Sequence, residues 1–206
     1  ALFNLLTGSR QKVANYAGVT VERKEGQLTL PNGKHLRILD LPGTYSLYPR
    51  SQDERITCDV LMGRAIGEKR PDVLVCVVDA TNLRRSLRLV LAVKRTGLPC
   101  VVALNMSDMA AKRGLHIDTQ ALSQALGLPV VSTVAVQADG ANSLRDWLAS
   151  DSDSLSLSLS QSLGVLHESA SSGGAQTAGL STGATTSQAI AHAVGLYWQG
   201  LDGGAS

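Results

Sequence analysis

Short apolar runs alternate with amphipathic segments along the first 150 residues of the chain. Continuous, β-branched apolar runs predict strands that are covered on both faces, because a half-exposed strand would alternate; they lie at 73–80, 99–106 and 128–135. Amphipathic spacing predicts helices at about 52–66, 83–96, 119–126 and 142–149. This succession is typical of an α/β domain with a largely parallel sheet.

Two shorter patterns extend this domain toward its start. Strands at Gln27–Leu30 and Leu36–Asp40 are joined by "PNGK", and Asn-Gly is a strong hairpin signal, so we expect a mixed sheet. The opening segment "ALFNLLTGSR" has helical spacing. Its inner face is expected to be Leu2, Phe3, Leu5 and Leu6.

Composition changes sharply after residue 150. All 19 Lys and Arg precede this point, and residues 151–206 carry only four acidic residues. Residues 151–186 are rich in Ser, Gly and Ala, which predicts a low-complexity linker. Residues 187–206 include the helically spaced "SQAIAHAVGLYWQGL", which predicts a short helical segment that would pack on the main domain or on a partner.

Charge and cysteine content only partly narrow the possible ligands of the chain and its redox environment. The first 150 residues carry an excess of six positive charges, which suits a phosphate ligand or an anionic surface, although a solvated basic face is the commoner reason. Three widely spaced cysteines favour reduced thiols over a disulfide framework. The histidines show no metal-binding spacing, and the absence of a run of about 18 apolar residues means that we expect no membrane span.

The segment "HLRILDLPGTYSL" places a candidate functional carboxylate at the end of a predicted strand. Asp40 follows the strand and is followed by Leu41, Pro42 and Gly43, which is the DxxG arrangement of GTPases. There the carboxylate holds Mg²⁺ through water and the glycine N–H meets the γ-phosphate. An Asp before Pro-Gly is also an ordinary turn, and this motif alone does not decide between the two.

A second motif ends the strand at 99–106. Asn105, Met106, Ser107 and Asp108 match the NxxD pattern for guanine recognition. The carboxylate of Asp108 would accept hydrogen bonds from guanine, whereas adenine would present an acceptor to it. The alternative interpretation of this segment is an ordinary Asn/Asp turn. That alternative is less favoured because both motifs occur in order, with a strand and a helix between them.

The segment "NYAGVTVERKEG" is predicted to be a mobile loop. Thr20 supplies the hydroxyl that a first switch needs to ligate Mg²⁺ and sense the γ-phosphate. A threonine that simply enters a strand through Thr20-Val21-Glu22 is the alternative interpretation.

These residues resemble one family, the amino-terminal G domain of the bacterial ferrous iron transport protein B. The resemblance spans nearly all of residues 1–148 and rests on "ALFNLLTG", "NYAGVTVERKEG", "ILDLPGTYSL", "DERI", "PDVLVCVVDATNL", "VVALNMSDMAAKRG" and "LGLPVV". It implies GTP and GDP as ligands, Mg²⁺ and K⁺ as cofactors, and slow GTP hydrolysis that regulates an Fe²⁺ transporter. It also implies a place on the cytoplasmic face of the bacterial inner membrane, a membrane domain of the same polypeptide as partner, and no nucleic acid.

The resemblance assigns roles to sixteen positions. The first switch is Gly18, Val19, Thr20, Val21 and Glu22, and Thr20 and Asp40 are the Mg²⁺ residues, the latter through water. The segment that contacts the γ-phosphate is Asp40, Leu41, Pro42 and Gly43. The segment that binds guanine is Asn105, Met106, Ser107 and Asp108. The last guanine loop is Val134, Ala135 and Val136. Thr44 stands where Ras-like proteins have the glutamine that positions water, so no catalytic side chain is assigned.

The phosphate-binding motif G-x-x-x-x-G-K-[ST] is absent from the sequence. We therefore predict a P-loop GTPase-like α/β fold in which residues 1–150 form a G domain truncated at its amino terminus, without the first strand and P-loop. The chain by itself is predicted neither to hydrolyse GTP nor to fold stably. Two alternatives stay open: a decayed, non-catalytic interaction module, and a soluble ribosome-associated GTPase.

Overall fold

The computed structural model describes residues 1–8, 11–44, 47–150 and 192–198. The helices of this part are α1 (Leu2–Thr7), α2 (Gln52–Leu61), α3 (Leu83–Lys94), α4 (Ser107–Lys112), α5 (Thr119–Leu126) and α6 (Asn142–Ala149). The strands are β1 (Gln11–Asn15), β2 (Glu22–Thr29), β3 (His35–Leu41), β4 (Val73–Asp79), β5 (Cys100–Asn105), β6 (Val130–Thr133) and β7 (His192–Trp198).

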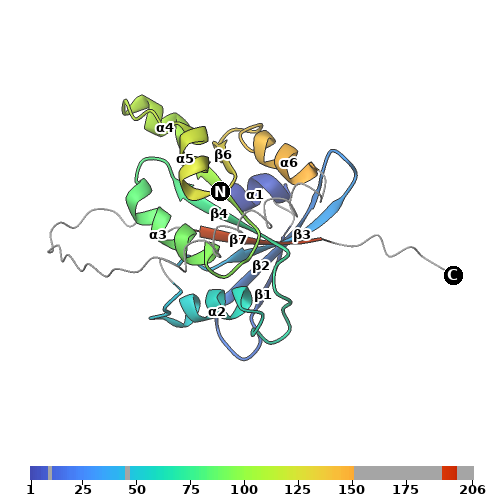
Figure 1. Ribbon diagram of the computed structural model, residues 1–206. Coiled ribbons are helices and arrows are strands. Elements are labelled where there is room, and N and C mark those ends of the chain that lie inside the picture. Colours follow the sequence, from blue (N-terminus) through green and yellow to red (C-terminus); the bar gives the residue numbers. More distant parts are fainter. Residues whose placement is uncertain (9–10, 45–46, 151–191, 199–206) are drawn as a thin grey trace, which may run out of the picture.

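These strands form one sheet in the order β1-β2-β3-β7-β4-β5-β6. The three strands β4, β5 and β6 are parallel, whereas β1, β2, β3 and β7 are each antiparallel to their neighbours. Because β7 is antiparallel to both β3 and β4, those two strands run in the same direction. The predicted mixed sheet is therefore confirmed, but it is less parallel than expected, because only the β4–β5 and β5–β6 pairings are parallel. Strand β7 crosses the middle of the sheet (Figure 1).

Helices cover both faces of the sheet (Figure 1). One apolar cluster joins β3, β4 and β5 to α2 and α3, with Val60, Leu89 and Val90 almost inaccessible to solvent. The other cluster joins the opposite face to α1 and α6, through Phe3 and Leu144 among others. The continuous apolar runs of β4 and β5 follow from this two-sided burial.

Most of the predicted elements are confirmed, although β2 begins at Glu22, five residues before the predicted Gln27. The hairpin closes with Leu30 N–H donating to the Lys34 carbonyl at 2.9 Å, and Gly33 takes a positive φ of 80° that glycine adopts without strain. Helix α5 begins after Asp118, whose carboxylate accepts hydrogen bonds from the next turn's amides, as an N-cap should. On α1, Leu2, Phe3 and Leu6 are buried, and Leu5 is partly buried.

The prediction of a helix in 187–206 is wrong for the described part of that segment, because residues 192–198 form strand β7. Helical spacing in a short segment is only a local signal, and here pairing with two strands overrides it. The predicted linker at 151–186 lies outside the described residues. Helix α2 ends at Leu61 rather than near 66, since Gly63 and Gly67 take positive φ values in the turns that follow.

Two elements were missed by the sequence reasoning. Strand β1 is exposed along its whole length, so it lacks the apolar alternation of a half-buried strand. Helix α4 has six residues, too few to show a period. Across the described part of the chain, no helix combines the length and apolarity needed to cross a bilayer.

Candidate functional site

Polar residues end several strands at the same edge of the sheet. Strands β3, β4, β5 and β6 run in one direction, so their carboxyl ends bring Asp40, Asp79, Asn105 and Thr133 to that edge. Open α/β sheets bind their ligands there. Asp40 and Asn105 are separated by three strand spacings, about 14 Å at the usual spacing.

The side chain of Asn105 joins the two segments that the sequence assigns to guanine. Its Oδ1 accepts a hydrogen bond from the Ala135 N–H at 3.1 Å and contacts the Thr133 hydroxyl at 3.5 Å. The Ser107 hydroxyl adds a bond to the Thr133 carbonyl at 3.3 Å. The NxxD segment and the loop after β6 therefore form one hydrogen-bonded unit.

Met106 has an unusual backbone conformation. Its φ of 62° makes it the one non-glycine residue with positive φ in the part of the chain that the structure describes. A left-handed conformation at such a residue carries a cost that the surrounding structure must offset, and outliers of this kind concentrate at functional sites. Met106 precedes the first turn of α4, which contains the half-buried Asp108, and its side chain is 38% exposed.

A tight loop follows β6. Val134 N–H donates to the Gly140 carbonyl at 2.8 Å, and Gln137 N–H donates to the Val134 carbonyl at 2.9 Å. A Cβ atom on residue 140 would lie 1.9 Å from the Val134 carbonyl oxygen. Glycine is therefore required at 140 to close the loop that carries Val134, Ala135 and Val136.

Asp79 also ends a strand at this edge, and no sequence motif pointed to it. Its Oδ1 accepts hydrogen bonds from the Thr81 N–H at 2.8 Å and from the Thr81 hydroxyl at 2.7 Å. The Ala80 N–H, one residue on, donates to the Asn105 carbonyl at 2.9 Å. An Asp that ends a buried strand and precedes a Thr two residues later is the signal that points to such a turn.

A cavity of about 240 Å³ lies beside the end of β3. It is lined by Val21, Glu22, Lys24, Asp40, Leu41, Pro42 and Asp53. The hydroxyl of Thr57 on α2 donates to the Pro42 carbonyl at 2.8 Å and so holds the wall of this cavity against the helix. The cavity thus gathers three carboxylates and one ammonium group.

Lys24 is the cation of this cavity. Its Nζ lies 2.9 Å from Glu22 Oε1. The hydrogen bond and the charge of Glu22, together with the weaker effect of the Asp40 charge, raise the pKa of Lys24. Lys24 therefore stays protonated beside Asp40.

The predicted switch residues are only partly brought together. Val21 and Glu22 share the cavity with Asp40, whereas Thr20 is exposed and lies outside its lining. Residues 16–21 form a turn in which Tyr16 N–H donates to the Val21 carbonyl at 3.0 Å, with Gly18 at a φ of 76°. The predicted mobile loop ends earlier than expected, because β2 begins at Glu22.

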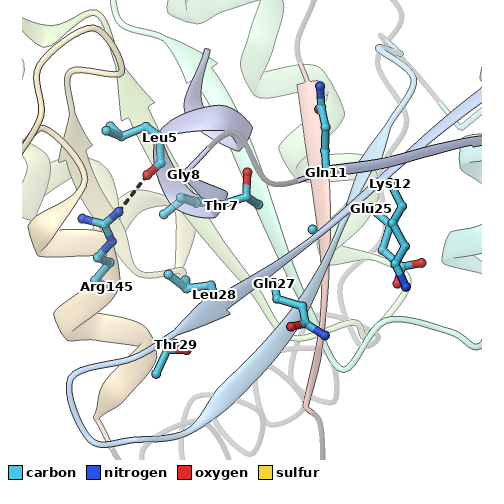
Figure 2. A pocket seen from close by; sticks show the side chains of 12 residues that line it. Leu5, Thr7, Gly8, Gln11, Lys12, Glu25, Gln27, Leu28, Thr29 and Arg145 are labelled. Carbon is cyan, nitrogen blue, oxygen red and sulfur yellow. Dashed lines mark hydrogen bonds between the residues drawn. The ribbon is translucent and has the colours of Figure 1, made fainter.

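A larger cavity of about 910 Å³ lies between α1, β2 and α6, and no sequence motif indicated it (Figure 2). Arg145 closes one side by donating to the Leu5 carbonyl at 2.8 Å. Gln11, Lys12, Gln27 and Thr29 give part of the wall a polar character. This cavity borders α1, β1 and β2 and shares no lining residue with the cavity at Asp40.

Groups of His, Cys, Asp and Glu large enough to hold a metal ion by themselves are absent from the described residues. Magnesium, however, often binds through one or two carboxylates and the phosphates of its nucleotide. The oxygen donors of the Asp40 cavity are of that kind, so their chemistry fits a magnesium nucleotide.

Known proteins resemble this chain over its first three quarters. The family model described as "Ferrous iron transport protein B" matches residues 1–148. The Fe(2+) transporter FeoB of Escherichia coli (strain K12) is 48% identical over 149 residues, which cover 70% of this chain and 18% of the relative. The chain thus spans less than a fifth of the length of that curated relative.

Solved structures show the same fold. The cytosolic domain of T. maritima FeoB in its GMPPNP form has 41% identity and a TM-score of 0.64, covering 70% of this chain and 55% of that one. The GDP form I of the same domain gives 41% identity and a TM-score of 0.64, covering 71% and 55%. The P-loop GTPase-like fold is therefore confirmed, and the chain belongs to the ferrous iron transport protein B family.

Proposed function

We propose that the carboxyl edge of the sheet binds GTP and GDP. The observation that carries this proposal is the hydrogen-bonded unit formed by Asn105 with Thr133 and Ala135. It fixes the NxxD segment against the loop after β6, so that two separate stretches of chain face one base. The GMPPNP and GDP forms of the T. maritima relative support a guanine nucleotide as the ligand.

Guanine would be recognised mainly by Asp108. Its carboxylate accepts hydrogen bonds from the N1–H and exocyclic amino group of guanine, whereas adenine presents an acceptor at that place. Met106 and Ser107 would support this group, the first as a flexible apolar cover and the second through its bond to the Thr133 carbonyl. Val134, Ala135 and Val136 would complete the base site through their backbone.

The phosphate end would lie at the cavity beside β3. Asp40 would hold Mg²⁺ through a water, and the Gly43 N–H would meet the γ-phosphate, with Leu41 and Pro42 shaping the turn. Bound magnesium supplies charge neutralisation for the phosphates. Thr20 would join this group only after the segment Gly18–Glu22 moves, since it lies outside the cavity in the present conformation.

We further propose that this segment is the regulatory G domain of a longer Fe²⁺ transporter. In that protein it would hydrolyse GTP slowly, with K⁺ as a further cofactor, on the cytoplasmic face of the inner membrane and next to the membrane domain of the same polypeptide. Thr44 is fully buried, which fits the absence of a water-orienting side chain after the DxxG glycine. The 206-residue chain alone is proposed to be inactive, because its sequence contains no phosphate-binding loop.

The substitution Asp108→Asn tests the base assignment. An amide offers a donor where xanthine carries an oxygen, so the variant should lose about 100-fold in GDP affinity and gain a comparable preference for XDP. Fluorescent GDP and XDP are titrated into the 206-residue chain and into a longer polypeptide that includes the phosphate-binding loop. Asp146→Asn, an exposed position on α6, is the matched control.

Several outcomes would contradict the proposal. If Asp108→Asn keeps the GDP preference of Asp146→Asn, the carboxylate does not read the base. Failure of the longer polypeptide to bind GDP would instead support the decayed interaction module. GTP turnover by the 206-residue chain at the rate of the longer polypeptide would refute its proposed inactivity.

A further inference from the structure

Helix α3 carries a row of arginines on its outer side. Arg84, Arg88, Leu91 and Arg95 follow one another at intervals of four, three and four residues, and together they are called the α3 stripe. A helix turns by about 100° per residue, so these four positions lie within about 60° of one another around the axis. All four residues are exposed, and Leu91 is 47% exposed.

The α3 stripe lies opposite the buried side of the helix. Ser86, Leu89, Val90 and Val93 are buried, and α3 contacts β4 and β5. The stripe therefore points away from the sheet, and Figure 1 shows α3, in green, on the outside of the domain. Because α3 connects two parallel strands, it runs back along the side of the sheet, and only its first turn lies near the carboxyl edge.

The fold does not neutralise the charge of the α3 stripe. In the part of the chain that the structure describes, none of its three arginines forms an ion pair or a side-chain hydrogen bond. The surrounding sequence offers no counter-ion, because neither Asp nor Glu occurs between Asp79 and Asp108. Arg70 donates to the Thr96 carbonyl at 2.8 Å and adds a further cation near the end of the helix.

We propose that the α3 stripe binds an anionic lipid surface. Its guanidinium groups would bind the phosphates of lipid headgroups, since their paired N–H donors match phosphate oxygens. Leu91 would enter the boundary between headgroups and acyl chains, as apolar residues of interfacial helices do. A nucleic acid would also satisfy the arginines, but it would leave Leu91 without an apolar partner. The combination of cations with an exposed leucine therefore favours lipid.

This inference rests on the proposed function only for the place beside a membrane, and it does not depend on nucleotide binding. The stripe spans about 16 Å along the helix, which suits a flat and reversible contact. A domain that lies on a membrane through the side of α3 keeps the carboxyl edge of its sheet open. The nucleotide could then exchange while the domain stays on the lipid.

Vesicle sedimentation tests the proposal with the longer polypeptide that includes the phosphate-binding loop and lacks the proposed membrane domain. Phosphatidylcholine vesicles are compared with vesicles that contain about one-third phosphatidylglycerol. The wild type should bind only the anionic vesicles and should lose most of this binding at high salt. The double substitution Arg84→Gln with Arg88→Gln should weaken binding about 30-fold. Leu91→Gln should weaken it about fivefold.

The matched control is the double substitution Lys12→Gln with Lys34→Gln. It removes the same charge near α1 and α6, which cover the opposite face of the sheet. Lys12 lines the cavity beside α1, and Asn32, in the turn that contains Lys34, donates to the Ala149 carbonyl at the end of α6. This control should weaken vesicle binding less than about threefold.

Circular dichroism confirms that each variant is folded, and a GDP titration separates this proposal from the proposed nucleotide site. Binding to anionic vesicles without binding of GDP would refute the nucleotide site and leave the lipid contact standing. Equal vesicle binding by the two double variants, or no binding of the folded wild type to anionic vesicles, would overturn the proposal. Wild-type vesicle binding by Leu91→Gln would also overturn it, because the stripe would then recognise negative charge alone, as nucleic acids supply it.

Discussion

Glu68 belongs to an ion-pair cluster whose contribution to the free energy of unfolding can be predicted. It lies in the turns between α2 and β4, and its side chain is only 4% exposed. Its Oε2 accepts from Arg37 Nη2 at 2.7 Å, and its Oε1 accepts from Arg23 Nε. Glu25 on β2 bonds to the same two arginines. The cluster of Arg23, Glu25, Arg37 and Glu68 is therefore neutral and ties the turn to β2 and β3.

The substitution Glu68→Gln keeps the size of this side chain and removes its charge. Two half-buried guanidinium groups would then share the single carboxylate of Glu25. Removing one partner of a fully buried pair costs about 3–5 kcal/mol. The arginine side chains are 19% and 20% exposed, so solvent screens part of the imbalance, and we expect a loss of about 2 kcal/mol.

Urea and thermal unfolding measure this loss in the longer polypeptide that includes the phosphate-binding loop, since the 206-residue chain by itself is not expected to fold stably. About 2 kcal/mol corresponds to a roughly 30-fold change in the folding equilibrium and, for a chain of this size, to a fall of about 4–8 °C in Tm. The matched control is Glu22→Gln. Glu22 and Lys24 form an exposed pair, with side chains 55% and 41% accessible, so its removal should change the free energy of unfolding by less than about 0.5 kcal/mol.

Comparing Glu68→Gln with Glu22→Gln tests whether burial strengthens the ion-pair cluster. If Glu68→Gln and Glu22→Gln shift the urea midpoint equally, burial does not strengthen the cluster and the reasoning fails. A loss confined to low ionic strength would also refute it, because salt screens exposed pairs much more than buried ones.

Two further predictions concern acid stability and the loop after β6. Burial opposes the charge of Glu25, but the hydrogen bonds and charges of Arg37 and Arg23 outweigh it and lower its pKa below the ordinary 4.5. The stabilisation from the Glu25 carboxylate should therefore be complete above about pH 4.5 and be lost as the pH falls through its lower, folded-state pKa. Urea midpoints measured between about pH 7 and 3 should then fall more steeply for the wild type than for Glu25→Gln. Gly140→Ala should cost about 2 kcal/mol in thermal unfolding, since its Cβ would lie 1.9 Å from the Val134 carbonyl oxygen, and equal melting with the exposed control Ala138→Ser would contradict this.

The sequence predicted well those elements whose signals are local. Helices α5 and α6 were predicted with the same bounds that the structure shows, because each has a full amphipathic period and α5 has a capping Asp118. Strands β4 and β5 were predicted because burial on both faces makes them continuously apolar.

The site was predictable where a motif lies at the end of such a strand. Asp40 and Asn105 both follow apolar runs, so their common edge follows from the topology. The bonds from Asn105 to residues 133 and 135 were not predictable, since they depend on how two loops meet. Thr20 shows the same limit: its residue type suggested a role, but its distance from the cavity depends on where β2 begins.

Strand β7 shows most clearly what cannot be predicted from local sequence patterns. The segment around it has helical spacing, and only the unpaired edges of β3 and β4 make a strand the better conformation. Those edges belong to residues more than 110 positions earlier in the chain. A sequence pattern read in short windows carries no information about such partners.

The position of β7 also sets the geometry of the proposed nucleotide site. Asp40 belongs to the half of the sheet that contains β3, whereas Asn105 belongs to the half that contains β5. Their separation of about 14 Å includes one strand spacing on each side of β7. Within the described residues, β3 and β4 are linked through β7, so this strand sets the separation of the proposed phosphate end and base end. The register Asp40↔Val194 places this link at the cavity itself, so β7 and the proposed nucleotide edge are parts of one structural unit.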